Sequence, residues 1–100
     1  MHEPDLATPF GLRTLSSAHP AFRSDGYHTG AVWPFDTWLG APWLWPGMLE
    51  AVERVGGFPE LYVVERDGTL RPHPEACAVQ AWTVGAVLAA RAGWDGRAWA

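Results

Sequence analysis

The spacing of apolar and polar positions divides the chain into an N-terminal stretch without period and a second part with regular elements. Residues 1–32 are interrupted by proline and glycine and show neither helical nor strand period. We therefore expect a long ordered loop there. Linkers lack aromatic residues, whereas this stretch contains Phe10, Phe22, Tyr27 and His28. A loop of this length and composition is typical of a functional segment.

Two short helices are expected after this loop. Pro34 favours a helix start, because its missing N–H is not needed in the first turn. That helix must be short, since Pro42 disfavours helical backbone at the residue before it. A second helix is expected from Pro46, ending at Gly56. Its apolar face comprises Met48, Leu49, Val52 and Val55.

The period changes to that of strands over residues 58–71. Residues 61–64 are strand formers, and Asp67-Gly68 is a strong signal for a two-residue turn. The pattern therefore predicts a short β-hairpin.

The last predicted element is a helix from about Pro74 to Arg91, which is apolar nearly all round. Such a helix belongs in the interior of a larger body. Gln80 would be a lone amide in this helix and would need a hydrogen-bond partner.

Composition limits the kinds of protein that fit. The 100 residues allow one small domain or a piece of a larger one, and 48% of them are hydrophobic. The net charge is −4, and the 7 basic residues are all arginine. Because no basic stripe is present to neutralise phosphates, nucleic acid is not expected as a partner.

The cysteine, the histidines and the apolar stretches of the sequence indicate its cellular location and whether it holds a metal or cofactor. Cys77 is the single cysteine, so no internal disulfide forms, and the N-terminus has no secretory signal. The apolar stretch 77–90 is too short to span a bilayer. We expect a cytoplasmic protein without a membrane partner. The histidines and Cys77 lack zinc-site spacing, and no phosphate-binding loop is present, so neither a metal nor a cofactor is expected.

The densest group of chemically capable residues is the segment 27–36. An imidazole, a carboxylate and large aromatic faces surround a glycine turn in this segment, which includes Tyr27, His28, Trp33 and Asp36. Indole rings can cover the C–H faces of a sugar while His and Asp bond to its hydroxyls. The alternative is that Trp33 and Phe35 are core packing and that His28 and Asp36 bond to each other or cap the start of the helix.

Glu60 and the pair Gln80 and Trp82 are further candidates. Glu60 follows a proline between apolar neighbours, and a carboxylate held in this way could act as a general base, although a lone Glu at the start of a strand is more often a solvated charge. Trp82 could be core. The remaining tryptophans are interpreted as packing residues or as part of a protein interface; they are Trp38, Trp43, Trp45, Trp94 and Trp99.

Four blocks of sequence follow one another along the chain: Gly11-Leu12-Arg13-Thr14-Leu15, Tyr27 to Asp36, Phe58-Pro59-Glu60-Leu61, and Ala76-Cys77 with Gln80-Ala81-Trp82. Taken in this order, they resemble the C-terminal third of bacterial amylo-alpha-1,6-glucosidase-type proteins. These glycoside hydrolases are similar to glycogen debranching enzyme and mannosylglycerate hydrolase and have an (α/α)6 barrel. The resemblance covers about residues 9–92.

The resemblance implies an inverting hydrolase with a mainly α fold, in which Glu60 matches the general base. The sugar subsite would be lined by Tyr27, His28, Trp33 and Asp36, with Gln80 and Trp82 on the inner helix behind it. The general acid of the family is an upstream Asp that this chain does not contain, and Asp36 does not match it.

We therefore expect residues 1–100 to be a C-terminal piece of the catalytic (α/α)6 domain, with Met1 at an internal start and the rest of the barrel upstream. The substrate would be an α-glucan or related glycoside, and the chain alone would be inactive without its acid. The stretch between Trp33 and Glu60 is shorter than in the family pattern, so Glu60 could lie at a different position from the family's general base. Two alternatives are a noncatalytic sugar-binding remnant and a structural interaction module.

Overall fold

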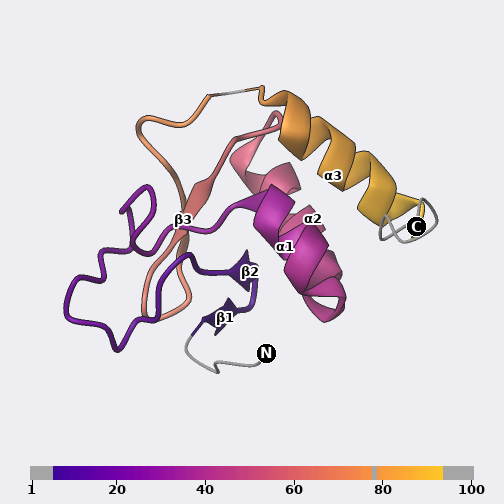
Figure 1. Ribbon diagram of the computed structural model, residues 1–100. Coiled ribbons are helices and arrows are strands. Elements are labelled where there is room, and N and C mark those ends of the chain that lie inside the picture. The colour runs from indigo at the N-terminus through magenta and orange to yellow at the C-terminus, as the bar shows by residue number, and fades with distance from the viewer. Residues whose placement is uncertain (1–5, 78, 94–100) are drawn as a thin grey trace.

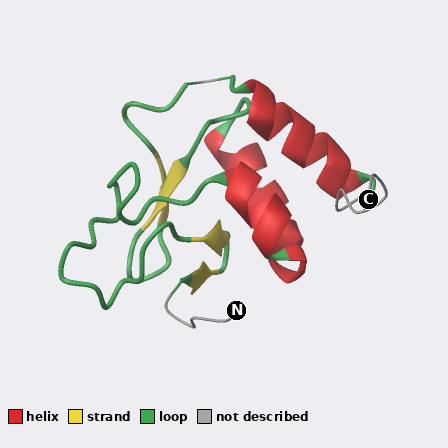
Figure 2. Cartoon of the chain, viewed as in Figure 1, coloured by secondary structure: helices red, strands yellow, loops and turns green. Residues whose placement is uncertain are grey.

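The computed structural model describes residues 6–77 and 79–93. Its helices gather on one side of the molecule, and the long N-terminal loop extends on the other (Figure 1). The helices are α1 (Pro34–Gly40), a 3-10 turn η1 (Pro42–Leu44), α2 (Trp45–Val55) and α3 (Ala81–Arg91). The strands, shown in Figure 2, are β1 (Ala7–Thr8), β2 (Gly11–Leu12), β3 (Tyr62–Val64) and β4 (Leu70–Pro72).

The N-terminal stretch is less irregular than the sequence indicated. Strands β1 and β2 form a small antiparallel hairpin, so the expectation of a loop without strands was wrong there. Beyond β2 the chain is a loop as far as α1, closed by isolated bridges that pair Val32 with both Arg13 and Tyr62. Val32 thus joins the two ends of the loop to β3. A strand of two residues is too short to show the alternation of apolar and polar residues by which strands are predicted.

Helices α1 and α2 confirm the predicted pair. Pro34 occupies the first turn of α1, which ends at Gly40 before Pro42. Helix α2 begins at Trp45, one residue before the expected start, and Gly56 follows its end with a φ of 93°. A positive φ of this size favours glycine, which explains why the helix stops there.

The predicted β-hairpin is also present. Strands β3 and β4 pair antiparallel, with Tyr62 opposite Pro72 and Val64 opposite Leu70. The turn is wider than the two residues expected, because Glu65 N–H donates to the carbonyl of Thr69 at 2.9 Å. Asp67-Gly68 lies inside this turn.

Helix α3 begins at Ala81, so the predicted start near Pro74 was wrong. The backbone groups of the residues before α3 are hydrogen-bonded to the segment ahead of β3 instead of to a helix. Gln80 N–H donates to Phe58 O at 2.8 Å, and Glu60 N–H donates to Cys77 O at 3.2 Å. Gln80 is therefore the N-cap of α3, and its side chain accepts from the Trp82 amide. Gln80 therefore does not lie inside the helix as a lone amide, as the predicted longer helix implied.

The core lies between the helices and β3. It comprises Val32, Met48, Ala51, Val52, Tyr62, Val64, Val87 and Ala90, and Trp38 and Trp45 pack against it. The packing interpretation is confirmed for those two tryptophans, whereas Trp43 is 52% exposed. Trp94 and Trp99 lie outside the described residues. Helix α3 is buried on one side only, and Trp82 and Leu88 are exposed, which agrees with the expectation that so few elements cannot surround it.

The described residues thus form three α-helices and two small antiparallel hairpins in one body. Most of the regular structure is helical, as the mainly α prediction states. Within residues 6–77 and 79–93, every helix is too short to cross a bilayer.

Candidate functional site

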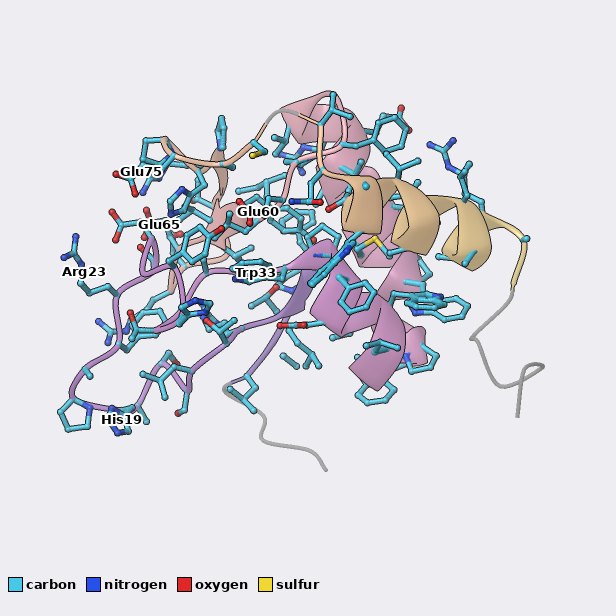
Figure 3. All side chains as sticks on the ribbon, turned by 45° about the horizontal axis from the view of Figure 1, so that its top comes forward. His19, Arg23, Trp33, Glu60, Glu65 and Glu75 are labelled. Carbon is cyan, nitrogen blue, oxygen red and sulfur yellow. The ribbon has the colours of Figure 1, made fainter. Side chains whose placement is uncertain are left out.

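A cavity of about 450 Å³ lies where the loop before α1, the segment ahead of β3 and the start of α3 meet. Its lining residues are His28, Trp33, Phe35, Glu60, Gln80, Trp82 and Thr83. Figure 3 shows Trp33 and Glu60 near one another beside the helices. The fold therefore brings together most of the candidate residues, although they come from distant parts of the chain. Their roles stay predictions.

One wall of the cavity is built from His28 and Trp33. Their rings stack at 5.6 Å between centroids, with an angle of 11° between the planes. The indole N–H of Trp33 donates to the carbonyl of Tyr27 at 2.8 Å. Because its N–H is used and one face is covered by the imidazole, Trp33 acts mainly as a rigid wall.

A second wall is formed by Phe35 and Trp82, whose ring centroids are 5.1 Å apart. Trp82 lies in the first turn of α3 and is 62% exposed. A large aromatic face that is open to solvent at a cavity can stack on the apolar face of a sugar. Phe35 was interpreted from sequence only as possible packing, and its place in the wall follows from the position of α3.

Glu60 is half-buried at the cavity, and its carboxylate accepts a hydrogen bond from the Tyr27 hydroxyl. This hydrogen bond is the largest cause that raises the pKa of Tyr27 to about 12; desolvation and the negative charge of Glu60 act in the same direction. Tyr27 does not line the cavity. It contacts the Glu60 carboxylate and is itself 37% exposed.

Thr83 fixes the backbone next to Glu60. Its buried hydroxyl donates to the carbonyl of Pro59 at 2.7 Å. Sequence analysis missed this residue. Thr83 lies three positions after Gln80, and residues three apart share a helix face. Recognising Gln80 as the N-cap would therefore have indicated Thr83 as a second residue facing the cavity.

Asp36 lies in the first turn of α1 and does not line the cavity. Partial desolvation raises the pKa of its carboxyl, and the nearby positive charge of His28 acts in the opposite direction. Asp36 is therefore a neighbour of the cavity residue His28. Direct contact of Asp36 with a sugar remains a prediction.

The site offers a carboxylate, an amide and aromatic faces. Across the described ranges, no group of three or more His, Cys, Asp or Glu side chains is arranged to hold a metal ion. Glu60 is the carboxylate among the described lining residues. A carboxylate fixed beside an aromatic cavity can accept a proton from a water molecule.

Comparison with known proteins gives a match over the first 73 residues. Residues 1–73 match the family model described as a mannosylglycerate hydrolase MGH1-like glycoside hydrolase domain. The matched range includes the loop and Glu60, whereas Gln80, Trp82 and the rest of α3 lie beyond it. No curated protein matches the chain.

Proposed function

Since the chain belongs to the MGH1-like glycoside hydrolase domain family, we propose that its cavity holds a sugar and that Glu60 is the general base of an inverting hydrolysis. The observation that carries this proposal is the position of the Glu60 carboxylate, held by Tyr27 at a cavity with aromatic walls.

In this reaction Glu60 takes a proton from a water molecule as the water oxygen attacks the anomeric carbon. A second carboxyl group, about 6.5–9.5 Å from the first in inverting enzymes, donates a proton to the leaving oxygen. The described lining residues do not supply that acid. Asp36 is not assigned this role, because it lies beside His28 and outside the lining.

The sugar itself would be held by stacking and by hydrogen bonds. Trp82 offers its exposed face, and His28 and Trp33 form another wall of the cavity. Gln80 accepts from the Trp82 amide at 3.3 Å through its side-chain oxygen, so its NH₂ group can donate to a sugar hydroxyl. Tyr27 positions the base.

For the substrate we propose α-linked glucose, as in amylo-alpha-1,6-glucosidases and other debranching enzymes. The description of the matched family names mannosylglycerate instead, a compound that carries a carboxylate. The two possibilities differ in charge, and they can therefore be separated by experiment.

The general-base role is best tested with α-glucosyl fluoride. Fluoride leaves without protonation, so this substrate does not require the general acid. We expect slow release of β-glucose by the chain, reduced about 10²- to 10⁴-fold in Glu60→Gln, while maltose binding persists. Unchanged release in Glu60→Gln would show that Glu60 is not the base. Glu53→Gln, an exposed carboxylate on α2, is the matched control.

The second candidate function is sugar binding without catalysis. It is favoured by the open indole of Trp82 at a cavity whose described lining has a single carboxylate. In this case maltooligosaccharides would produce a saturable change in tryptophan fluorescence that survives Glu60→Gln. Glucosyl fluoride would not be hydrolysed above the rate in buffer.

A further inference from the structure

Hydrogen bonds join each of the residues 58–60 to the start of α3 or to the segment just before it. Phe58 O and Glu60 N–H take part in backbone bonds to that segment. Between them, Pro59 O accepts a hydrogen bond from the Thr83 hydroxyl at 2.7 Å. The segment that carries Glu60 is thus held from the side of α3, while Tyr27 contacts its carboxylate.

The side chain of Thr83 is buried, although it belongs to the lining of the cavity. Thr83 lies in the first turn of α3 and is 1% exposed. A threonine in a helix can bond its hydroxyl to a carbonyl of the same helix, whereas Thr83 donates to a carbonyl 24 positions earlier in the chain. Its hydroxyl is therefore used to join α3 to Pro59.

The carbonyl that Thr83 holds determines the orientation of Glu60. Pro59 O and Glu60 N–H belong to the same peptide unit, which is planar. Thr83 fixes the oxygen side of this plane, and Cys77 O fixes the N–H side at 3.2 Å. The proline ring also fixes φ at residue 59. The direction in which the Glu60 side chain leaves the backbone is thereby restricted from both sides of the peptide plane.

We propose that Thr83 is a positioning residue for Glu60 and that α3 acts on the reaction through it. The inference rests on the proposed function of Glu60 as the general base. Thr83 lies beyond the matched residues 1–73, so the family match does not assign it a role. Misplacing a reacting group by about 1 Å can reduce a rate about 10²-fold, so a small rotation of this peptide plane is sufficient to affect the reaction.

The first test is hydrolysis of α-glucosyl fluoride by the whole chain carrying Thr83→Val. Valine has nearly the same shape as threonine and lacks the hydroxyl. We expect kcat to fall about 10- to 100-fold, with KM and the dissociation constant of maltose unchanged, because the aromatic walls remain. Thr83→Ser keeps the hydroxyl and should recover most of kcat. An unchanged kcat in Thr83→Val, with the loss still present in Glu60→Gln, overturns the inference alone.

The second test measures the position of Glu60 without a substrate. The pKa of Tyr27 is raised to about 12, chiefly by its hydrogen bond to Glu60. In Thr83→Val this pKa should fall towards 10.0, whereas that of Tyr62, which is raised by burial, should stay high while the chain is folded. A Tyr27 pKa that stays near 12 shows that the carboxylate has not moved, and it overturns the inference.

Gly85→Ala separates positioning from stability. A Cβ at Gly85 meets nothing within 4 Å, so alanine should stabilise α3 without touching Glu60. Adding Gly85→Ala to Thr83→Val should raise the denaturation midpoint and leave both kcat and the Tyr27 titration impaired. Recovery of both by Gly85→Ala would show a merely structural role and overturn the inference.

Thr83→Ser keeps the proposal falsifiable if the valine variants do not fold. This variant must retain the raised Tyr27 pKa and most of kcat, and loss of either overturns the inference. Hydrolysis that is absent from the unaltered chain, or unchanged in Glu60→Gln, overturns the proposed function of Glu60 and the inference with it. The two failures are therefore distinguished by Glu60→Gln.

Discussion

The hydroxyl of Tyr27 donates a hydrogen bond to the carboxylate of Glu60, although the two residues are 33 positions apart. The bond joins the long loop to the segment ahead of β3. It places a neutral donor on the carboxylate and keeps the carboxylate at the cavity. Tyr27, which the resemblance places in the sugar subsite, contacts Glu60 in the structure, and its contact with a sugar stays a prediction.

This hydrogen bond predicts an unusual phenol titration. The pKa of Tyr27 is raised from 10.0 to about 12, and burial raises the pKa of Tyr62 further. These are the 2 tyrosines of the chain, so ultraviolet absorbance should show no phenol ionising near pH 10 while the chain is folded. The Tyr27 contribution to folding is complete below pH 10.0 and is lost as the pH rises towards about 12.

Glu60→Gln provides the control for this titration. Removing the charge should lower the pKa of Tyr27 towards its ordinary value and leave that of Tyr62 raised, because burial is unchanged. Glu53→Gln should not move either titration. A first ionisation near pH 10 in the unaltered, folded chain would contradict the Tyr27–Glu60 contact.

Trp82→Ala should weaken maltooligosaccharide binding about 2- to 13-fold, since aromatic stacking contributes about 0.5–1.5 kcal/mol beyond buried area. The measurement is the dissociation constant from calorimetry. Trp43→Ala is the matched control, because Trp43 is 52% exposed but does not line the cavity. Equal effects of the two substitutions would show that Trp82 is not the sugar platform.

Thr83→Val should destabilise the fold by about 1–3 kcal/mol. The substitution leaves the buried carbonyl of Pro59 without the donor that now lies at 2.7 Å. Thr83→Ser keeps a hydroxyl and should recover most of the loss. Urea denaturation measures both variants, and identical stability of the Val and Ser proteins would show that the hydrogen bond contributes little.

Gly47→Ala should also destabilise the fold, by about 1–3 kcal/mol, because the added Cβ would lie 1.8 Å from the carbonyl oxygen of Pro9. Gly85→Ala is the opposite case. Its Cβ meets nothing within 4 Å, and replacing a glycine inside a helix stabilises by about 0.5–1 kcal/mol. Denaturation midpoints should therefore shift in opposite directions, and a shift in the same direction would contradict the close approach at Gly47.

The sequence predicted those elements whose boundaries depend on local chemistry. Pro34 and Gly56 limit α1 and α2 through their own backbone preferences, and these boundaries were predicted to within one residue. The start of α3 was not predicted, because it depends on hydrogen bonds between residues 77–80 and 58–60. Such pairings join distant segments and leave no periodic signal in either.

The candidate site shows the same division. Glu60 and Trp82 were singled out from their residue types and from the resemblance, and both line the cavity. Asp36 was grouped with them because it belongs to the segment 27–36 that matches the family's sugar-subsite loop, but it lies outside the lining. Thr83 was missed, because its hydrogen bond to Pro59 exists only once α3 is docked.

The double pairing of Val32 has a consequence for the order of folding. Val32 bonds to Tyr62 in both directions at 2.9 Å, and Tyr62 belongs to the core. Because Val32 and Tyr62 lie far apart in the sequence, we expect the aromatic loop to be fixed beside Glu60 late in folding, since contacts between distant segments require closure of the intervening chain. Under the proposed function, local opening of the loop should abolish sugar binding while the helical circular dichroism signal persists.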